Sequence, residues 1–375
     1  MGVQGLKERS AAARAWLVGS ALPLWSDAGF DAQTGLFEEK LDLDGRPVPG
    51  PRRVRVQNRQ LYVFVQAGRL GWTGPWRERA LAGLATVLGP AKAPGGGVGH
   101  LLDERGRLID PRRDLYDQAF GLFALAQARG LDAARADARI GEVVGYLATQ
   151  RGPNGGFLEG EIKPAPRWQN PHMHLFEAGI ALHEAGSPHG LALASEVAGL
   201  FDRYFFDAQN GALGEYYNDD LSRAPGKVGR LCEPGHHFEW IWLLDRWRKV
   251  SGEDRDAAAQ RLWSHAVTHG LSGGVAIDEV WRDGGARTAS ARLWPQTERL
   301  KAALVRFERG GDAADAGAAA AAYDGLETYF HGLKPGLWRD RRDADGGFAD
   351  EPAPASSFYH IVLALSELFR VADAL

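Results

Sequence analysis

Apolar residues recur at every third or fourth position along several long segments, the spacing that is typical of amphipathic α-helices. Residues 113–130 place their apolar side chains on one stripe, and the segment ends at Gly130, a common helix stop. Residues 236–252 and 358–375 have the same pattern. Alternating patterns of Val, Ile, Thr and Tyr, which indicate strands, are scarce. The hydrophobic pattern therefore predicts an all-α protein.

Short glycine-led segments recur between these helical segments at intervals of about sixty residues. Six of them are marked by Gly35, Gly97, Gly155, Gly211, Gly274 and Gly346, which are 62, 58, 56, 63 and 72 residues apart. Each segment has turn glycines followed by apolar and acidic residues, a composition that suits a tight loop or short hairpin. Each unit therefore has room for one loop and two helices of typical length.

Six such units predict an (α/α)6 barrel, in which six helical hairpins close into a toroid of six inner and six outer helices. An open helical solenoid and two separate helical domains are the alternatives. A solenoid usually has shorter repeats with a more regular sequence period, and no Pro-rich or Ser-rich linker divides this chain. The sequence therefore favours one closed domain over residues 1–375, with outer helices predicted at 77–88 and 316–322.

The composition limits the classes of function. The 375 residues carry a formal net charge of −4 with no basic block, which argues against a nucleic-acid-binding protein. No run of about 18 apolar residues is present, so no transmembrane helix is expected. The apolar stretch near the N-terminus contains Arg14 and predicts an amphipathic helix rather than a signal peptide. The single cysteine, Cys232, excludes an intrachain disulfide and favours a cytoplasmic location.

Polar or aromatic residues stand near the start of each predicted inner helix. One residue in each unit falls at the same phase, with steps of 57, 58, 62, 58 and 66 residues: Arg59, Tyr116, His174, His236, Trp294 and His360. Asn170, Glu239 and Gln296 lie in the same segments. Side chains at one phase of a closed ring converge on its mouth, so residues far apart in sequence would share a pocket. Each of them taken singly could be structural, and their common phase is what favours a functional site.

The segment RWQNPHMHLFEA contains two histidines that are candidates for a metal site. Asn170 followed by Pro171 suggests an N-cap and the first residue of a helix. On such a helix His174 shares a face with Glu177, whereas His172 points about 200° away from His174. The two histidines therefore do not favour one metal ion, and no metal site is predicted. On a strand they would lie on the same side, so this prediction depends on the helix.

The segment EPGHHFEWIWLL predicts a second helix start, at Pro234. His236 and Glu239 share one face of this helix, while His237 lies off that face and suits a surface or packing role. The positive end of the helix dipole favours a neutral imidazole, the form that accepts a proton near pH 7. The pattern therefore predicts a His236 that can accept a proton, although a single histidine in a helix is more often structural.

Six segments resemble, in sequence and in order, the N-acylglucosamine 2-epimerase family, in particular its aldose–ketose isomerase branch: QNRQLYVF, LYDQAF, QNPHMHLFEA, PGHHFEWIWLL, WPQTERLKA and FYHI. They span about three hundred residues. The late segment GLWRDRRDADGGFADEPAPASSFYHI is most similar to members assigned to mannose isomerisation. The resemblance implies an (α/α)6 barrel, in agreement with the repeat pattern.

The resemblance also implies a reaction without metal or cofactor, in which a proton moves between C1 and C2 of an open-chain sugar or C2 is inverted. It matches His236 and His360 to the two acid/base histidines, and Glu239 to the neighbouring carboxylate. The residues that match substrate contacts are Arg59, Tyr116, Asn170, His174 and Trp294, and Gln296 is a further candidate contact. We expect His360 to carry the proton between C1 and C2 and His236, oriented by Glu239, to open the ring. The reverse assignment stays open.

The expected reaction interconverts D-mannose and D-fructose, or D-lyxose and D-xylulose, through a cis-enediolate. The alternative is a sugar 2-epimerase acting on mannose, glucose or an N-acylglucosamine. Epimerases of acylamino sugars in the family are expected to use a nucleotide activator, and this chain has no convincing nucleotide motif. A glycoside hydrolase would need two facing carboxylates about 5–10 Å apart, for which Glu239, Glu177 and Asp117 are available. A sugar-binding protein without catalysis is the remaining alternative.

The expected ligand is a monosaccharide rather than a nucleic acid or a membrane, bound by a monomer or a homodimer. The sequence leaves open whether the sugar carries a phosphate or a sulfonate. Arg55, Arg287 and Arg292 are the candidate contacts for such an anion.

Overall fold

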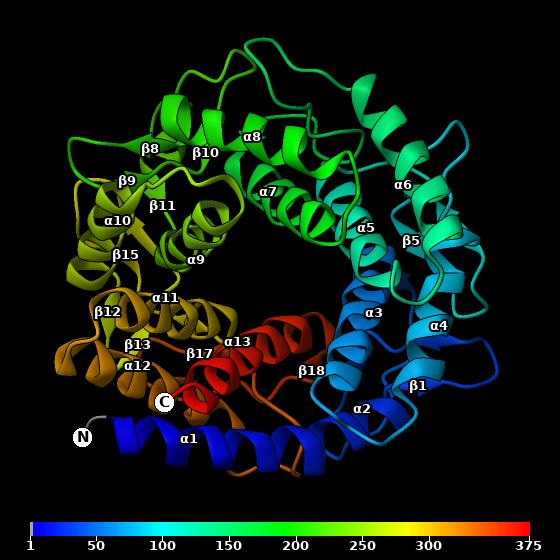
Figure 1. Ribbon diagram of the computed structural model, residues 1–375, viewed down its shortest axis with the longest axis horizontal. Helices are drawn as coiled ribbons and strands as arrows, with labels where there is room; N and C mark the ends of the chain where they lie inside the picture. Colours follow the sequence, from blue (N-terminus) through cyan, green and yellow to red (C-terminus); the bar gives the residue numbers. More distant parts are fainter. Residues whose placement is uncertain (1–2) are drawn as a thin grey trace.

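The computed structural model describes residues 3–375 and contains a ring of helices in two layers (Figure 1). The inner layer consists of α3 (Val54–Arg69), α5 (Leu115–Ala128), α7 (Gln169–Glu184), α9 (Pro234–Ser251), α11 (Trp294–Gly310) and α13 (Ala355–Asp373). Each inner helix contacts the next one along the chain, and α13 contacts α3, which closes the ring. The predicted (α/α)6 barrel is therefore confirmed.

The outer layer packs against the inner layer in pairs. It consists of α1 (Val3–Trp16), α2 (Leu22–Asp27), α4 (Trp76–Leu88), α6 (Ala133–Ala148), α8 (Gly190–Leu200), α10 (Asp256–His269) and α12 (Ala313–Glu327). Short π-helical turns follow α1 (Leu17–Ala21) and α8 (Phe201–Phe205), and 3-10 turns cover Val228–Arg230 and Thr328–Phe330. The outer helices α4, α6, α8, α10 and α12 each pack on the inner helix that precedes them in the chain. Helix α1 packs on α13 and α12. The sixth hairpin is thus built from the first and last helices of the chain.

The loops between the helices contain strands of two or three residues that pair in antiparallel fashion. The pairs are β1 (Phe30–Asp31) with β2 (Leu36–Phe37), β3 (Lys40–Leu41) with β18 (Ala353–Pro354), β7 (Arg167–Trp168) with β10 (Tyr216–Tyr217), β8 (Phe206–Asp207) with β9 (Ala212–Leu213), β12 (Leu271–Ser272) with β13 (Val275–Ala276), and β16 (Ala291–Arg292) with β17 (Arg341–Arg342). Two sheets have three strands, β4 (Arg52–Arg53), β5 (Leu101–Leu102) and β6 (Leu108–Asp110), and β11 (Leu231–Cys232), β14 (Glu279–Trp281) and β15 (Ala286–Thr288).

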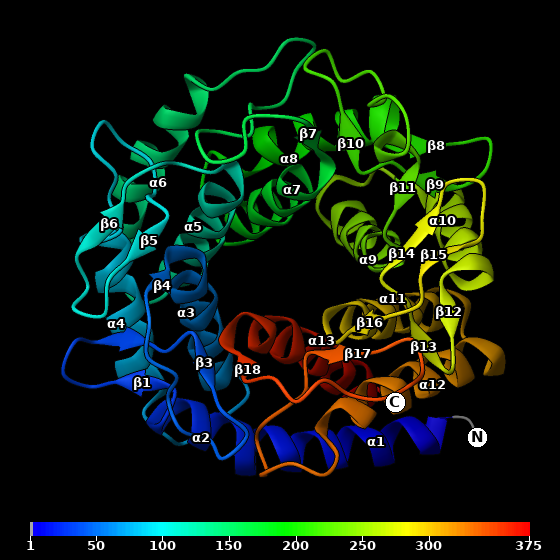
Figure 2. The ribbon, with the colours of Figure 1, turned by 180° about the vertical axis from the view of Figure 1, so that it is seen from behind.

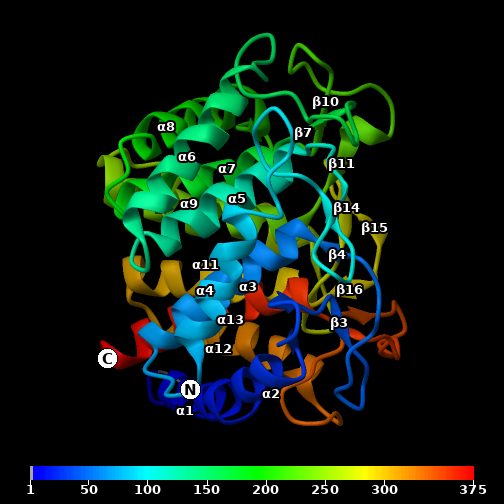
Figure 3. The same ribbon diagram turned by 90° about the vertical axis from the view of Figure 1, so that its right-hand side faces the viewer.

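These strands gather at one end of the barrel, the end that faces the viewer in Figure 2 and lies to the right in Figure 3. Strands β4, β7, β11, β16 and β18 lead directly into the inner helices α3, α7, α9, α11 and α13. The N-terminal ends of the inner helices therefore lie at this end, beneath a rim of short hairpins.

A repeated side-chain clamp joins the inner helices to the glycine-led loops. The side-chain amides of Gln57, Gln118 and Gln296 each accept from the N–H and donate to the C=O of one loop residue, which lies twenty positions earlier in the chain. The loop residues are Phe37, Val98 and Ala276, and the distances are 2.7–2.8 Å. His172 and His237 make a similar contact through Nε2, which accepts from the backbone N–H of Phe157 at 3.1 Å and of Leu213 at 3.0 Å. Five of the six glycine-led loops are thus tied to the first turns of an inner helix through a backbone N–H of the loop.

Aromatic residues connect the two layers in the core. The ring of Trp240 on α9 lies 5.3 Å from that of Phe176 on α7 and 4.6 Å from that of Phe201, which follows α8. At Gly179 the helices α7 and α8 approach so closely that a Cβ atom would come within 2.8 Å of Ala194 N. Within residues 3–375, no helix is both long and apolar enough to cross a membrane.

Candidate active site

The six residues of common phase lie at the N-terminal end of the inner ring, one on each inner helix. Arg59 is on α3, Tyr116 on α5, His174 on α7, His236 on α9, Trp294 on α11 and His360 on α13. The ring centroids of neighbours are close: 5.0 Å for Tyr116 and His174, 5.0 Å for His236 and Trp294, and 5.9 Å for Trp294 and His360. The structure therefore brings together residues that are up to about three hundred positions apart in sequence.

Arg59 joins the first and last helices of this arrangement. Its Nη2 donates to the hydroxyl of Tyr116 at 2.5 Å, and its Nη1 donates to the carbonyl of Ser356 on α13 at 3.2 Å. The guanidinium lies 4.1 Å from the centroid of Phe120, and its Nε, which is buried, has no partner among the described residues. A cation in such an aromatic setting is held rigidly and retains a donor for an oxygen of a ligand.

His360 is held by a buried carboxylate that the sequence analysis missed. Its Nδ1 lies 3.0 Å from Glu298 Oε1, and Glu298 Oε2 lies 2.5 Å from Lys301 Nζ. Burial holds the pKa of His360 well below its ordinary value, and the positive charges of Arg59 and Lys301 add to this effect. A carboxylate at Nδ1 favours the tautomer with its hydrogen there, so Nε2 is left free to accept a proton.

His236 has a different carboxylate partner from the one predicted. Its Nδ1 lies 2.9 Å from Glu215 Oε2, on the loop after β9, and no hydrogen bond joins it to Glu239. Glu215 is held in turn by Gln169 Nε2 at 2.9 Å and by the backbone N–H of Glu233 at 3.2 Å. The prediction that Glu239 orients His236 is therefore wrong, because the rim loop places Glu215 closer.

The charge state of His236 also differs from the expectation of a neutral ring. Burial lowers the pKa of His236, but the negative charges of Glu215 and Glu233 outweigh it and raise the pKa to about 9. The helix dipole that favours the neutral form is a weaker effect than two carboxylates within a few ångströms. The two histidines of the site are thus opposites near neutral pH, since His236 is cationic and His360 is neutral.

Glu239 and Glu177 lie below the histidines, toward the centre of the barrel. Glu177 bonds to His174 Nδ1 at 3.1 Å and to the hydroxyl of Tyr359. Neither carboxyl oxygen of Glu239 has a hydrogen-bond partner within residues 3–375, and Oε1 lies 3.8 Å from His174 Nδ1. Burial, together with the charges of Glu298 and Glu177, raises the pKa of Glu239 well above its ordinary value. Burial and these neighbours therefore favour the protonated form of Glu239, which can donate a hydrogen bond.

Two groups of side chains have the spacing that a metal ion needs. In one, the ligand atoms of His174, Glu177 and Glu239 lie within 4.8 Å of one another, and the other consists of Glu215, Glu233 and His236. His172, in contrast, bonds to Phe157 N and Trp168 O and does not reach His174, as the helix periodicity predicted. The prediction of a reaction without metal is not tested by this geometry.

Asn170 occupies the second position of α7 rather than the predicted N-cap. Trp168 is the N-cap, because β7 runs straight into the helix, and Pro171 is tolerated in a first turn where its missing N–H is not needed. Asn170 Oδ1 is buried without a partner among the described residues. It faces a cavity of about 270 Å³ at the mouth of the ring, lined among others by Arg55, His100, Asp114, Tyr116, Glu159, Lys163 and Trp168.

The remaining predicted residues are placed as follows. Gln296 is fully buried and its amide is occupied by the loop clamp, so the structure does not bring it to the pocket with the others. Arg55 reaches the mouth cavity. Arg292 pairs with Glu233 and Asp278, and Arg287 pairs with Glu279, so both of these arginines are already matched by acidic partners.

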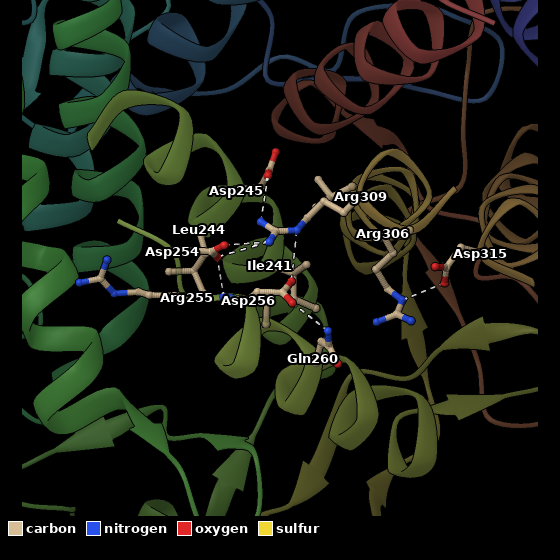
Figure 4. A pocket seen from close by; sticks show the side chains of 13 residues that line it. Ile241, Leu244, Asp245, Asp254, Arg255, Asp256, Gln260, Arg306, Arg309 and Asp315 are labelled. Atoms are coloured by element: carbon tan, nitrogen blue, oxygen red, sulfur yellow. Dashed lines mark hydrogen bonds and ion pairs between the residues drawn. The ribbon is translucent and has the colours of Figure 1, made fainter. Parts of the chain in front are cut away.

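A second charged region lies at the opposite end of α9 and α11, in a cleft of about 220 Å³ beside α10 and α12 (Figure 4). Arg309 contacts Asp245, Asp254 and Asp256 there, at 3.0–3.6 Å. Arg306 pairs with Asp315 at 3.0 Å. We name this region the ion-pair cleft. Both arginines have acidic partners, so they offer little to an anionic ligand.

Comparisons with known proteins match nearly the whole chain. The family model for N-acylglucosamine 2-epimerase matches residues 35–364. A mannose-6-phosphate isomerase of Rhizobium meliloti (strain 1021) is 42% identical over 370 residues, which cover 94% of this chain and 95% of that protein. A D-mannose isomerase of Thermobifida fusca is 28% identical over 366 residues, which cover 89% and 88% of the two chains.

Solved structures support the same fold. A cellobiose 2-epimerase of Spirochaeta thermophila DSM 6192 superposes with a TM-score of 0.86 at 20% identity and covers 98% of each chain. A D-mannose isomerase superposes with a TM-score of 0.83 at 20% identity and covers 98% of this chain and 97% of the other. The chain therefore belongs to the N-acylglucosamine 2-epimerase family, a family of sugar isomerases and epimerases.

Proposed function

We propose that this protein is an aldose–ketose isomerase that interconverts D-mannose and D-fructose. The observation that carries the proposal is the pair of buried histidines in opposite charge states, each held at Nδ1 by its own carboxylate. A neutral His360 can take a proton from carbon, and a cationic His236 can give one to oxygen. The two relatives described above both carry mannose in their names.

The first step in this mechanism opens the sugar ring. His236 donates its proton to the ring oxygen O5 as the C1–O5 bond breaks, and then recovers a proton from the O1 hydroxyl as the C1 carbonyl forms. Glu215 holds the imidazole in place and favours its cationic form, which is the form that the step requires. His236 is therefore cationic both before and after this step.

The second step moves hydrogen between two carbons. His360 Nε2 removes the proton from C2, the electron pair forms the C1–C2 double bond, and O1 gains negative charge. We assign Arg59 and a protonated Glu239 as the donors to this cis-enediolate, since Arg59 Nε and both carboxyl oxygens of Glu239 are buried without a partner among the described residues. The O2 hydroxyl proton then passes to O1, and His360 returns its proton to C1, which gives the ketose. The roles of His174, Tyr116, Asn170 and Trp294 are to bind the hydroxyl groups and the face of the sugar.

We propose an unphosphorylated substrate. Asp117 bonds to His100 at 2.7 Å and pairs with Arg55 at 3.6 Å, so the charge of Arg55 beside the mouth cavity is opposed by a buried carboxylate. Lys163, which also lines the cavity, lies over the ring of Trp168. Asp114 and Glu159 also line this cavity. A phosphate group requires positive charge that is not already matched. The mouth suits the neutral hydroxyl end of a sugar better.

A 2-epimerase is the second candidate, because His236 and His360 on α9 and α13 could exchange a proton with opposite faces of C2. A glycoside hydrolase is disfavoured, since Glu177 is bound to His174 and Tyr359, and Asp117 to His100. We also propose that residues 3–375 form one domain, because α1 packs on α13.

The test is to incubate the protein with D-mannose, and separately with D-mannose 6-phosphate, and to identify the products. D-fructose from free mannose supports the proposal. D-glucose as the main product identifies a 2-epimerase. Fructose 6-phosphate alone would reject the unphosphorylated substrate but keep the isomerase, and no turnover of either sugar would reject the isomerase. In heavy water, deuterium at C1 of fructose would reveal the exchangeable proton carried by His360.

A further inference from the structure

Lys301 on α11 is a lysine that lies entirely inside the protein. Its side chain has no solvent exposure, its Nζ lies 2.5 Å from Glu298 Oε2, and its Nζ lies 4.0 Å from the centroid of the Trp242 ring. A buried ammonium group needs an acidic partner or a polarised ring nearby, and here it has both. Neither step of the proposed reaction uses Lys301, so the reaction as described does not explain why this lysine is buried.

The charged groups around Lys301 come from four inner helices. Glu177 on α7 has His174 and Tyr359 as partners, and the pKa of Glu239 on α9 is raised by burial and by the charges of Glu298 and Glu177. Glu298 on α11 is fully buried and has Lys301 as its cation. On α3, Arg59 is occupied by Tyr116 and Ser356. Lys301 is therefore the group whose charge bears most directly on Glu298.

Glu298 in turn decides which nitrogen of His360 carries a hydrogen. As a carboxylate, Glu298 can only accept, so His360 carries its hydrogen on Nδ1, the nitrogen that lies 3.0 Å from Glu298 Oε1. If Glu298 took up a proton, it would donate to Nδ1, and the imidazole would then carry its hydrogen on Nε2. In that tautomer Nε2 has no free electron pair and cannot remove a proton from carbon.

We propose that Lys301 is a positioning residue of the proton-transfer site: its ammonium keeps Glu298 a carboxylate, and Glu298 then fixes the tautomer of His360 that presents a free Nε2 to the sugar. This inference rests on the proposed function for the catalytic importance of that tautomer, although the tautomer itself can be measured without any substrate. Stability alone does not call for Lys301, because a buried ion pair is often replaced by apolar residues without loss of stability.

The test compares Lys301→Met, Glu298→Gln and the double variant with the wild-type protein. We expect Lys301→Met to lower kcat about a hundredfold while KM changes less than about threefold, as for a group that acts on the base. A glutamine at position 298 cannot ionise, so the charge of Lys301 can no longer affect the protonation of this side chain. The double variant is therefore expected to be no slower than Glu298→Gln alone.

The second readout is the tautomer of His360, measured by NMR of protein with ¹⁵N-labelled histidine rings. The signals of His360 are assigned by their loss in His360→Gln. The hydrogen is expected on Nδ1 in the wild type and on Nε2 in Lys301→Met. Arg309→Met is the matched control, since it removes a cation from the same helix at the far end of the barrel and should change neither kcat nor the tautomer.

Lys301→Gln replaces Lys301→Met if the methionine variant does not fold. Unchanged tautomer and unchanged kcat in a folded Lys301 variant would overturn the inference, and so would losses that add in the double variant. If the wild-type protein does not act on any of the sugars, the proposed function fails, and the tautomer in Lys301→Met still decides whether Lys301 controls His360.

Discussion

Opposite ends of α9 and α11 carry charged side chains in two different arrangements. One is the ion-pair cleft, and the other is the floor of the candidate site, which consists of Glu177, Glu239, Glu298 and Lys301. In the cleft, Arg309 and Arg306 face aspartates that match their charge, and most of these groups reach water. On the floor, three carboxyl groups lie near one buried lysine, which pairs with Glu298, and Glu239 has no hydrogen bond within the part of the chain that the structure describes.

The difference separates stability from function. Paired charges near water contribute a little stability and have ordinary chemistry. Buried acids that crowd together have perturbed protonation, and such groups concentrate at functional sites at the expense of stability. We therefore expect charges at the cleft end of α9 and α11 to contribute to stability, and charges at the site end to contribute to the reaction. The predictions below test this division, from the largest expected effect to the smallest.

His360→Ala should have the largest effect, because it removes the proposed base. We expect kcat/KM for mannose to fall by about a thousandfold or more, the usual range for a general base. The melting temperature should stay within a few degrees of the wild type, and this is the control. A folded His360→Ala variant with full activity would remove the proposed role of His360.

Glu215→Gln should weaken His236 as an acid. Glu215 raises the pKa of His236, and above that pKa the ring loses the proton it must donate. The alkaline limb of the rate profile should therefore move from about pH 9 to a lower pH, with a loss of about tenfold at pH 8. The measurement is kcat/KM against pH. An alkaline limb that stays in place would mean that His236 is not the acid.

Gln296→Ala tests the loop clamp against the predicted sugar contact. The substitution leaves the buried N–H and C=O of Ala276 unpaired, so we expect a loss of about 3 kcal/mol in the free energy of unfolding. Gln118→Ala, in the equivalent clamp on α5, should lose a similar amount. If Gln296→Ala instead raises KM strongly and keeps its stability, Gln296 is a substrate contact after all.

Glu239→Gln should raise stability while it lowers turnover. The folded protein keeps a proton on Glu239 that the unfolded chain releases above its ordinary pKa of 4.5, so the wild type loses stability as the pH rises. Glutamine removes this loss, which is worth about 1.4 kcal/mol for each unit of pKa shift. Melting curves should show a stability gain that grows as the pH rises above the ordinary pKa of 4.5. A gain that is independent of pH would contradict the neutral state of Glu239.

Arg309→Met should have the smallest effect. Arg309 is partly exposed, so breaking its pairs in the ion-pair cleft should lower the free energy of unfolding by about 1 kcal/mol, and less in high salt. The activity should not change. A clear loss of kcat would mean that the two ends of α11 are coupled and that the division between them is wrong.

The repeat pattern alone predicted the barrel, because every unit must return the chain to the same phase of the ring. The short strands could not be predicted, since two residues are too few for a period-two pattern to appear. The convergence of the helix-start residues was also predicted, because phase in a closed ring fixes position.

The supporting carboxylates were missed for a physical reason. Glu215 lies on a rim loop, where no periodicity constrains direction, although an acid follows several of the glycine turns. Glu298 and Lys301 lie one and two turns after Trp294 on one helix face, a spacing that was visible in WPQTERLK. Their role depends on pairing across helices with His360, which a single segment does not specify.

The clamp between inner helices and rim loops has a consequence for engineering. Each glutamine clamp recognises only backbone atoms of its loop, so the side chain at the clamped position can change without loss of these hydrogen bonds. Glu215 is different, because its carboxylate reaches from the rim to His236. Libraries of rim sequences that keep the clamped turns and Glu215 should therefore alter which sugars enter the mouth while the groups on the helices stay in place.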